Sequence, residues 1–277
     1  MSETSDSLHD LPPAGLPTLL PLPAEAEAEL AEARRVLDET SLAVRLANMA
    51  GTPIEALRKR LPSSAQGMVD YAVKKALSKA LDAAMNSNPG AKPPIGLSAD
   101  WMHRGLAMAS GAAGGAFGLA GTLVELPVST TLLLRQIAVE AAAAGEDPRL
   151  PETGAECLKV FALGGPGGTD DSGETGYFAT RLALSRLLPN MSVALLPNFI
   201  AAIAARFMGP LMIKFGAQAA PVLGAAAGAA VNLAFLEHFR AVGRAHFTVR
   251  RLEREHGAEA VRAAYEVLAA RAQHRRG

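Results

Sequence analysis

Three carboxylates follow a glycine-rich loop near the middle of the chain. Residues 163–169 read Leu-Gly-Gly-Pro-Gly-Gly-Thr, and Asp170, Asp171 and Glu174 come next. If a helix begins near Asp171, Glu174 lies one turn further along the face that carries the two aspartates. Carboxylate oxygens are the ligands that hard divalent cations prefer. The spacing therefore allows a divalent-cation site, and such a site would suit a metal-dependent hydrolase.

The same residues also suit the start of a helix, and capping is the interpretation that we favour. Thr169 or Asp170 can accept hydrogen bonds from the N–H groups of the first turn, where acidic side chains interact favourably with the helix dipole. Asp171 and Glu174 have the spacing of a capping box. Cation binding and acid/base catalysis are the alternatives. A P-loop is excluded, because no Gly-Lys-Ser/Thr follows the glycines. Arg181, two turns after Glu174, is expected to form an internal ion pair.

Other residues that can do chemistry lack the spacing that a recognised site needs. The single cysteine, Cys157, excludes an internal disulfide or a cysteine-based zinc site and is expected to be buried. Intervals of eight and ten residues separate His238, His246 and His256, unlike the four-residue spacing of a zinc-binding helix. We interpret them as polar-face or partly buried histidines. Asn232 lies in an apolar run, so its amide is expected to bind a neighbouring helix. The sequence assigns no catalytic residue.

Helical periodicity dominates the chain, and no stretch alternates convincingly at period two. Aromatic residues are only 5% of the sequence, and much of the apolar content is alanine and glycine, which suits packed helices better than a sheet. We therefore predict an all-α fold, a multi-helix bundle with Gly/Ala-rich central helices. The main predicted helices cover about 24–50, 63–84, 151–163, 171–188, 221–255 and 258–274. A further helical segment runs from about 98 to 144 and is expected to be interrupted at Glu125-Leu-Pro127.

The first 23 residues differ from the rest of the chain. They contain five prolines and an acidic start, which indicate a disordered or peripheral arm that its leucines could dock on the body. Residues 24–277 are expected to form a single helical domain. The arm has no basic start followed by an apolar run, so no signal peptide is expected and the chain is predicted to be cytoplasmic.

Three uncharged windows are long enough to cross a bilayer: 105–124, 187–205 and 215–236. Glycines four residues apart, such as Gly111 and Gly115 or Gly224 and Gly228, would let helices approach closely in lipid. Alanine and glycine contribute little to insertion, however, and the mean hydropathy of +0.17 is low for a multi-span protein. We favour core helices packed through glycine, with peripheral insertion and true spanning as alternatives.

The net formal charge is zero, which argues against general nucleic-acid binding. Positive charge is nevertheless concentrated near the C-terminus, at Arg250, Arg251, Arg254, Arg271, Arg275 and Arg276. A solvated helix face is the favoured interpretation of these arginines, and contact with anionic lipid head groups is the alternative.

Three blocks of sequence carry a family resemblance in their order and spacing. The first contains Gly111–Gly121, Glu125-Leu-Pro127 and Leu134-Arg-Gln-Ile-Ala138; the second contains Leu163-Gly-Gly165, Asp170–Tyr177 and Arg181; the third contains Pro221–Asn232, His246-Phe247 and Arg250–Gly257. Together they resemble the EcsC family of bacterial proteins. Glu125 stands where the family pattern suggests Asp, and Phe178 where a second Tyr is common.

The resemblance implies a helical protein that works at or near the cytoplasmic membrane face. The family takes its name from a gene beside the ATPase and membrane subunits of an ABC-type transporter, and no catalytic residue carries over from it. The leading hypothesis is a non-enzymatic accessory protein that supports ABC-type transport or envelope processes, with membrane lipids or a transporter as partners. The alternatives are a metal-dependent hydrolase using Asp170, Asp171 and Glu174, and a protein that binds lipid or another apolar ligand.

Overall fold

The computed structural model describes residues 21–38, 66–85, 99–116, 118–163, 176–186, 200–204 and 224–274. These ranges contain helices and turns but no strand, so the predicted all-α fold is confirmed. The helices are α1 (Ala24–Asp38), α4 (Gln66–Met85), α5 (Ala99–Ala116), α6 (Gly118–Ala143), α7 (Pro151–Leu163), α8 (Gly176–Ser185), α10 (Gly224–His256) and α11 (Ala258–His274).

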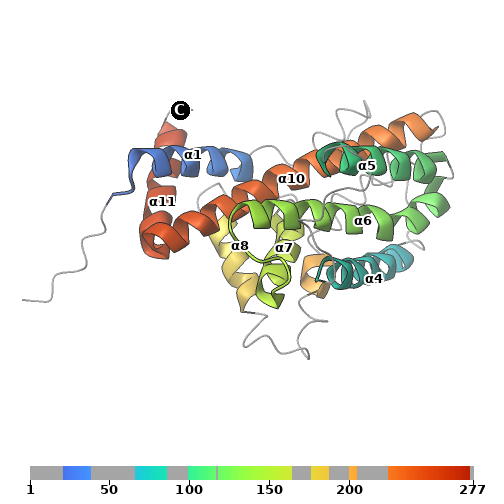
Figure 1. The fold of residues 1–277 in the computed structure, drawn as a ribbon, viewed down its shortest axis with the longest axis horizontal. Coiled ribbons are helices and arrows are strands. Elements are labelled where there is room, and N and C mark those ends of the chain that lie inside the picture. The colour runs from blue at the N-terminus through green and yellow to red at the C-terminus, as the bar shows by residue number, and fades with distance from the viewer. Residues whose placement is uncertain are drawn as a thin grey trace, which may run out of the picture.

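The longest helix, α10, is the axis on which the others are arranged (Figure 1). It has 33 residues, which corresponds to a length of about 50 Å at the usual rise of an α-helix. α5 and α6 pack along its first half, whereas α1 and α11 pack along its second half. α7 contacts α10 near its middle, α8 contacts both α7 and α10, and α4 packs against α6 and α7.

Two clusters of buried side chains follow this arrangement. The larger cluster joins α4, α6, α7 and the first part of α10, and its centre includes Leu134, Phe161 and Phe239. The smaller cluster joins α1, α8, α11 and the last part of α10 around Tyr265. Leu22, from the proline-rich N-terminal segment, is buried in the smaller cluster. The other leucines of that segment lie outside the described residues.

The predicted interruption at Glu125-Leu-Pro127 is wrong. α6 continues through Pro127, and the chain instead leaves one helix at Ala116 and begins the next at Gly118. A proline inside a helix removes one backbone donor, and its ring crowds the carbonyl of the preceding turn, at a cost of about 3 kcal/mol. Leu126 and Leu134 of α6 are buried on either side of Pro127, and this burial outweighs the missing hydrogen bond. The uncharged window 105–124 is therefore divided between two helices that pack against each other.

Local signals do locate other helix ends correctly. Gly257 has a φ of +89°, the left-handed conformation of a helix C-cap, and it separates α10 from α11 as predicted.

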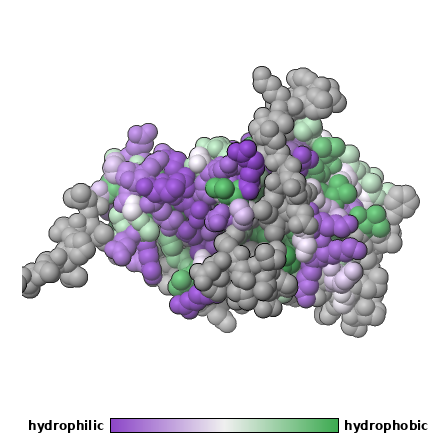
Figure 2. All heavy atoms as spheres, turned by 60° about the horizontal axis from the view of Figure 1, so that its bottom comes forward, coloured by the Kyte–Doolittle hydropathy of each residue, from purple (hydrophilic) through white to green (hydrophobic). Residues whose placement is uncertain are grey.

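Of the helices in the described ranges, none is long and apolar enough to cross a membrane. Hydrophilic side chains gather over the end that carries α1 and α11, and hydrophobic ones are more prominent at the opposite end (Figure 2).

Candidate functional site

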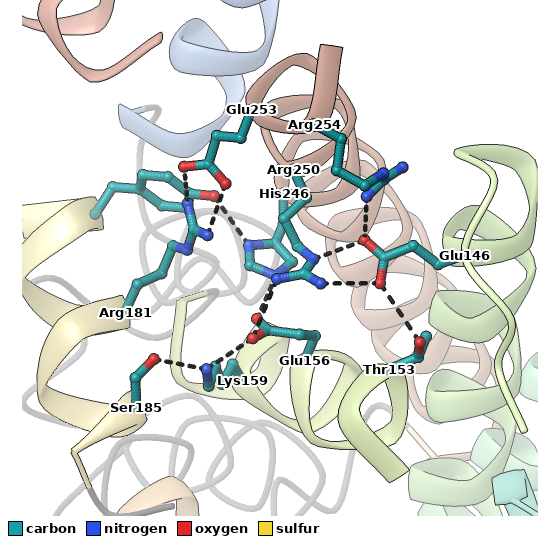
Figure 3. A network of polar contacts seen from close by, with 11 residues as sticks. Glu146, Thr153, Glu156, Lys159, Arg181, Ser185, His246, Arg250, Glu253 and Arg254 are labelled. Atoms are coloured by element: carbon teal, nitrogen blue, oxygen red, sulfur yellow. Dashed lines mark hydrogen bonds and ion pairs between the residues drawn. The ribbon is translucent and has the colours of Figure 1, made fainter. Parts of the chain in front are cut away.

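A network of polar side chains lies where α7, α8 and α10 meet (Figure 3). Within each helix most of the contributing positions are three or four residues apart, so they share one helix face. The network contains Glu156 and Lys159 of α7, Tyr177, Arg181 and Ser185 of α8, and His246, Arg250, Glu253 and Arg254 of α10. Glu146, between α6 and α7, joins it through Arg250 and Arg254.

His246 is the centre of the network and is completely buried. Its Nε2 lies 3.1 Å from Oε2 of Glu156, and its Nδ1 lies 2.9 Å from the Tyr177 hydroxyl oxygen. An ionised carboxylate can only accept hydrogen bonds, so the proton is assigned to Nε2. Nδ1 then accepts the hydrogen of the Tyr177 hydroxyl. A neutral imidazole therefore satisfies both neighbours at once.

Burial and neighbouring charges determine the charge states of His246, Glu156 and Tyr177. Burial lowers the pKa of His246, so the imidazole is neutral. Burial opposes ionisation of Glu156, but its hydrogen bond with His246 and the charges of Lys159 and Arg250 hold its pKa below the usual range. Burial also raises the pKa of Tyr177, which keeps the phenol protonated. The result is an ionised carboxylate beside a neutral histidine and tyrosine.

Lys159 connects the buried network to the surface. Only 3% of this residue is exposed. Its Nζ donates to Oε1 of Glu156 at 2.8 Å and to Oγ of Ser185 at 2.9 Å. Ser185 is exposed at the end of α8. A continuous chain of hydrogen bonds therefore runs from the Ser185 hydroxyl through Lys159, Glu156 and His246 to Tyr177.

The arginines of the network are ion-paired within the protein. Arg181 makes a two-pronged pair with Glu253 at 2.8 and 2.9 Å, and its guanidinium lies over the Tyr177 ring. Arg250 contacts both Glu146 and Glu156, at 2.7 and 3.2 Å. The expected internal ion pair of Arg181 is thus confirmed, with Glu253 of α10 as its partner. Glu174 lies outside the described residues.

The interpretation of the C-terminal arginines as a solvated face holds for Arg254 and Arg271, which are exposed, and is wrong for Arg250 and Arg251, which are only partly exposed. Arg250 and Arg254 bind Glu146, Arg251 binds Glu29 and Glu255, and Arg271 binds Glu27. Acidic side chains from α1 and from the α6–α7 connection therefore neutralise much of this positive charge. Arg275 and Arg276 lie outside the described residues.

Stability is expected to decrease as the pH falls below the ordinary histidine pKa of 6.5. The unfolded chain then binds a proton at His246 that the folded protein, with its lowered pKa, does not bind. Glu156 and Tyr177 face this imidazole. Burial lowers its pKa, the carboxylate of Glu156 opposes this shift, and the charges of Arg181 and Arg250 add to it, so that the net shift is downward. The loss cannot exceed about 1.4 kcal/mol per pH unit for this group. Urea unfolding between about pH 5.5 and pH 8 measures it.

The matched variants for this pH series are His246→Gln and His256→Gln. His256 is partly exposed beside Glu255. The first variant should flatten the dependence of the unfolding free energy on pH in this range, whatever its own stability, and the second should keep the dependence. If the unfolding free energy changed with pH equally in His246→Gln and in the unchanged protein, the conclusion that His246 is neutral would be contradicted.

A second polar cluster joins α5, α6 and α10. Asn232 is buried, and its Nδ2 lies 2.6 Å from Oε1 of Glu125 and 3.1 Å from both the Ala107 carbonyl and Oγ of Ser110. The expectation that this amide binds neighbouring helices is confirmed. One turn away, the Gly111 backbone lies directly against the Gly228 carbonyl, closer than any side chain would permit.

The predicted cation ligands Asp170, Asp171 and Glu174 lie outside the described residues, so this site stays a prediction. Within the described ranges, no three His, Cys, Asp or Glu side chains are grouped as a metal site would require. Cys157 is buried as expected, and burial raises the pKa of its thiol.

Sequence reasoning missed the buried network. Its signal was present in α7, where Glu156 and Lys159 interrupt an otherwise apolar run between Gly154 and Leu163. Charged residues at such positions need partners from another helix. His246 and Arg250 of α10 carry the same signal, because they lie among the apolar residues Ala245, Phe247 and Val249.

A third feature is the exposed side of α5. Trp101 is 68% exposed and Met108 is 42% exposed. Gly105, Ala112 and Ala116 continue the same helical stripe and are exposed or partly exposed. We call these five residues the α5 apolar face. None of the five is charged, and Arg104, which lies beside Trp101 and Met108 on this side of the helix, is paired with Glu237 of α10. On α6, Val124 and Val128 are also exposed.

Comparison with known proteins places most of these features in one family. The sequence model of the EcsC protein family matches residues 98–252, which is more than half of the chain. No curated protein and no solved structure gave a significant match. The matched region extends from the start of α5 almost to the end of α10, and it includes Glu156, Lys159, Tyr177, His246 and Arg250 of the buried network. The chain therefore belongs to the EcsC protein family.

Proposed function

We propose that this protein is a non-enzymatic accessory protein that binds the cytoplasmic face of the cell membrane through the α5 apolar face. At the membrane it supports ABC-type transport or another envelope process. The observation that carries the proposal is the exposure of Trp101 and Met108 on one side of α5, where the nearby Arg104 is paired with Glu237. Tryptophan is favoured where an apolar surface meets the head-group region of a bilayer.

The internal pairing of the arginines supports a particular mode of binding. Arg250, Arg251, Arg254 and Arg271 are each bound to acidic side chains of the protein. They offer little net positive charge to anionic lipid. Burial of apolar area, which depends weakly on salt, is then the main driving force. This differs from the electrostatic contact that the arginine-rich sequence alone suggested.

The buried network supports a structural role for its members. His246 lies between Tyr177 and Glu156. The Tyr177 hydroxyl and both ring nitrogens of His246 form hydrogen bonds within the protein. Asn232 of α10 likewise holds α5 through the Ala107 carbonyl and α6 through the Glu125 carboxylate. Such contacts fix the exposed face of α5 relative to the rest of the bundle.

Liposome flotation tests this function. The purified protein should float with vesicles of phosphatidylcholine alone, and about equally well when anionic lipid is added or when the salt is raised, because apolar contacts are not screened. Trp101→Asp combined with Met108→Asp should abolish most of the binding, since a charge is costly in the apolar part of a bilayer.

Val267→Asp is the matched control, because Val267 is 48% exposed on α11 at the other end of the molecule. It should leave flotation unchanged. Absence of flotation with both kinds of vesicle would rule out the proposal. Binding that requires anionic lipid, disappears at high salt and survives the double substitution on α5 would assign the contact to another surface.

A further inference from the structure

A pocket of about 360 Å³ opens between α8, the end of α10 and the beginning of α11. Phe178 and Leu182 of α8 form an apolar side, and Ser185 lies at the end of the same helix. Glu253 of α10 and the α11 residues Arg262 and Glu266 line the rest. The size falls within the range of known small-molecule sites, and the mixture of an apolar wall with a few polar groups is typical of them.

Ser185 is a prepared hydrogen-bond donor in this pocket. The buried ammonium of Lys159 donates to its Oγ at 2.9 Å, and Glu156 holds that ammonium in place at 2.8 Å. Oγ therefore acts as an acceptor toward Lys159, and the hydroxyl hydrogen is left to point in another direction. Ser185 lines the pocket, so its hydroxyl can donate a hydrogen bond to an acceptor oxygen of a ligand bound there.

The two ion pairs that line the pocket differ in strength. Arg181 and Glu253 have side chains that are each only 15% exposed, and they are joined by two hydrogen bonds, so this pair forms a fixed wall. Arg262 and Glu266 are 62% and 55% exposed and are joined across one turn of α11. Exposed pairs of this kind contribute little to stability. They can separate to bind a ligand that offers both charges.

We infer that this pocket binds a small zwitterion that carries an apolar substituent. The acidic group of the ligand binds Arg262 and the Ser185 hydroxyl, and its ammonium group binds Glu266. The apolar substituent lies against Phe178 and Leu182. A free amino acid with an apolar side chain has all three parts. The phosphoethanolamine head group of a lipid has the same two charges, and the rest of the lipid supplies the apolar part. The inference is independent of membrane binding through α5, because none of these residues belongs to that helix.

Isothermal titration calorimetry on the full chain tests the site with two probes, L-leucine and O-phosphoethanolamine. At least one should bind with one-to-one stoichiometry, and ethanolamine or inorganic phosphate alone should bind more weakly, because each carries only one of the two charges. Arg262→Gln and Ser185→Ala should each weaken binding about tenfold or more, the usual effect of losing a hydrogen bond to a charged group.

Arg271→Gln is the control, because Arg271 is also exposed on α11 but pairs with Glu27 of α1. It should leave the affinity unchanged. Binding of L-leucine alone would identify a free amino acid as the ligand class, and binding of O-phosphoethanolamine alone would identify a head group. Absence of heat with both probes, in a protein with unchanged helical circular dichroism, would overturn the inference. Equal affinity in Arg262→Gln, Ser185→Ala and the unchanged protein would also overturn it. Flotation of these variants should remain normal.

Discussion

Replacing Glu156 with alanine is expected to lower the free energy of unfolding by about 3–5 kcal/mol. Glu156 is the carboxylate that Lys159, Arg250 and His246 share. Without it, the Lys159 ammonium stays buried with only the Ser185 hydroxyl as a partner. A buried charge that has lost its counter-charge cannot regain its hydration, so the cost exceeds what the pair itself contributes. Urea unfolding followed by circular dichroism measures the change.

Two further variants separate this cause from a general loss of contacts. Glu255→Ala removes an exposed carboxylate whose partner Arg251 keeps Glu29, and it should change stability by less than about 0.5 kcal/mol. Glu156→Met combined with Lys159→Met removes both charges, and it should be more stable than Glu156→Met alone. If Glu156→Ala were as mild as Glu255→Ala, the network could not be buried as described.

The network explains how α8 is held in place. This helix has only 10 residues, and a helix of that length is marginal in water without tertiary contacts. Tyr177, Arg181 and Ser185 attach its inner face at three successive turns to His246, Glu253 and Lys159. The same helix forms the apolar wall of the pocket through Phe178 and Leu182. The geometry of the pocket therefore depends on the buried charges behind it.

Local sequence predicted the helices well wherever their ends carry local signals. Pro151 opens α7, and Gly257 closes α10, because the conformational preferences of proline and glycine act at single positions. Pro127 misled the prediction for the opposite reason. Its local preference against helix is overcome by the burial of Leu126 and Leu134, which depends on the packing of distant helices.

The partners of buried polar groups could not be predicted, because periodicity assigns a residue to a helix face without saying what that face meets. Arg181 was expected to form an internal ion pair and does so, but its partner Glu253 comes from α10, 72 residues later. His246 meets Glu156, which lies 90 residues earlier. What the sequence does show is that both residues lie among apolar neighbours, where an ionisable group requires a partner.

Replacing Gly111 with alanine is expected to destabilise the protein by about 1–3 kcal/mol, the range found when a packed core is overfilled. A Cβ at this position would lie 2.2 Å from the Gly228 carbonyl oxygen and 2.8 Å from Cβ of Asn232. Ordinary contacts begin at 3.4 Å, so α5 and α10 would have to separate. That movement also stretches the hydrogen bonds from Asn232 to Ala107 and Glu125.

Gly105→Ala on the same helix isolates the effect of the contact, because no atom lies within 4 Å of a Cβ at Gly105. Alanine favours helix over glycine by about 1 kcal/mol, so this variant should be more stable than the unchanged protein. The two substitutions are chemically identical, and both sites are helical. Opposite signs of the change in unfolding free energy can therefore arise only from the packing at Gly111. If both variants were stabilised equally, the backbones of α5 and α10 could not be in contact there, and the α5 apolar face would not be fixed by this crossing.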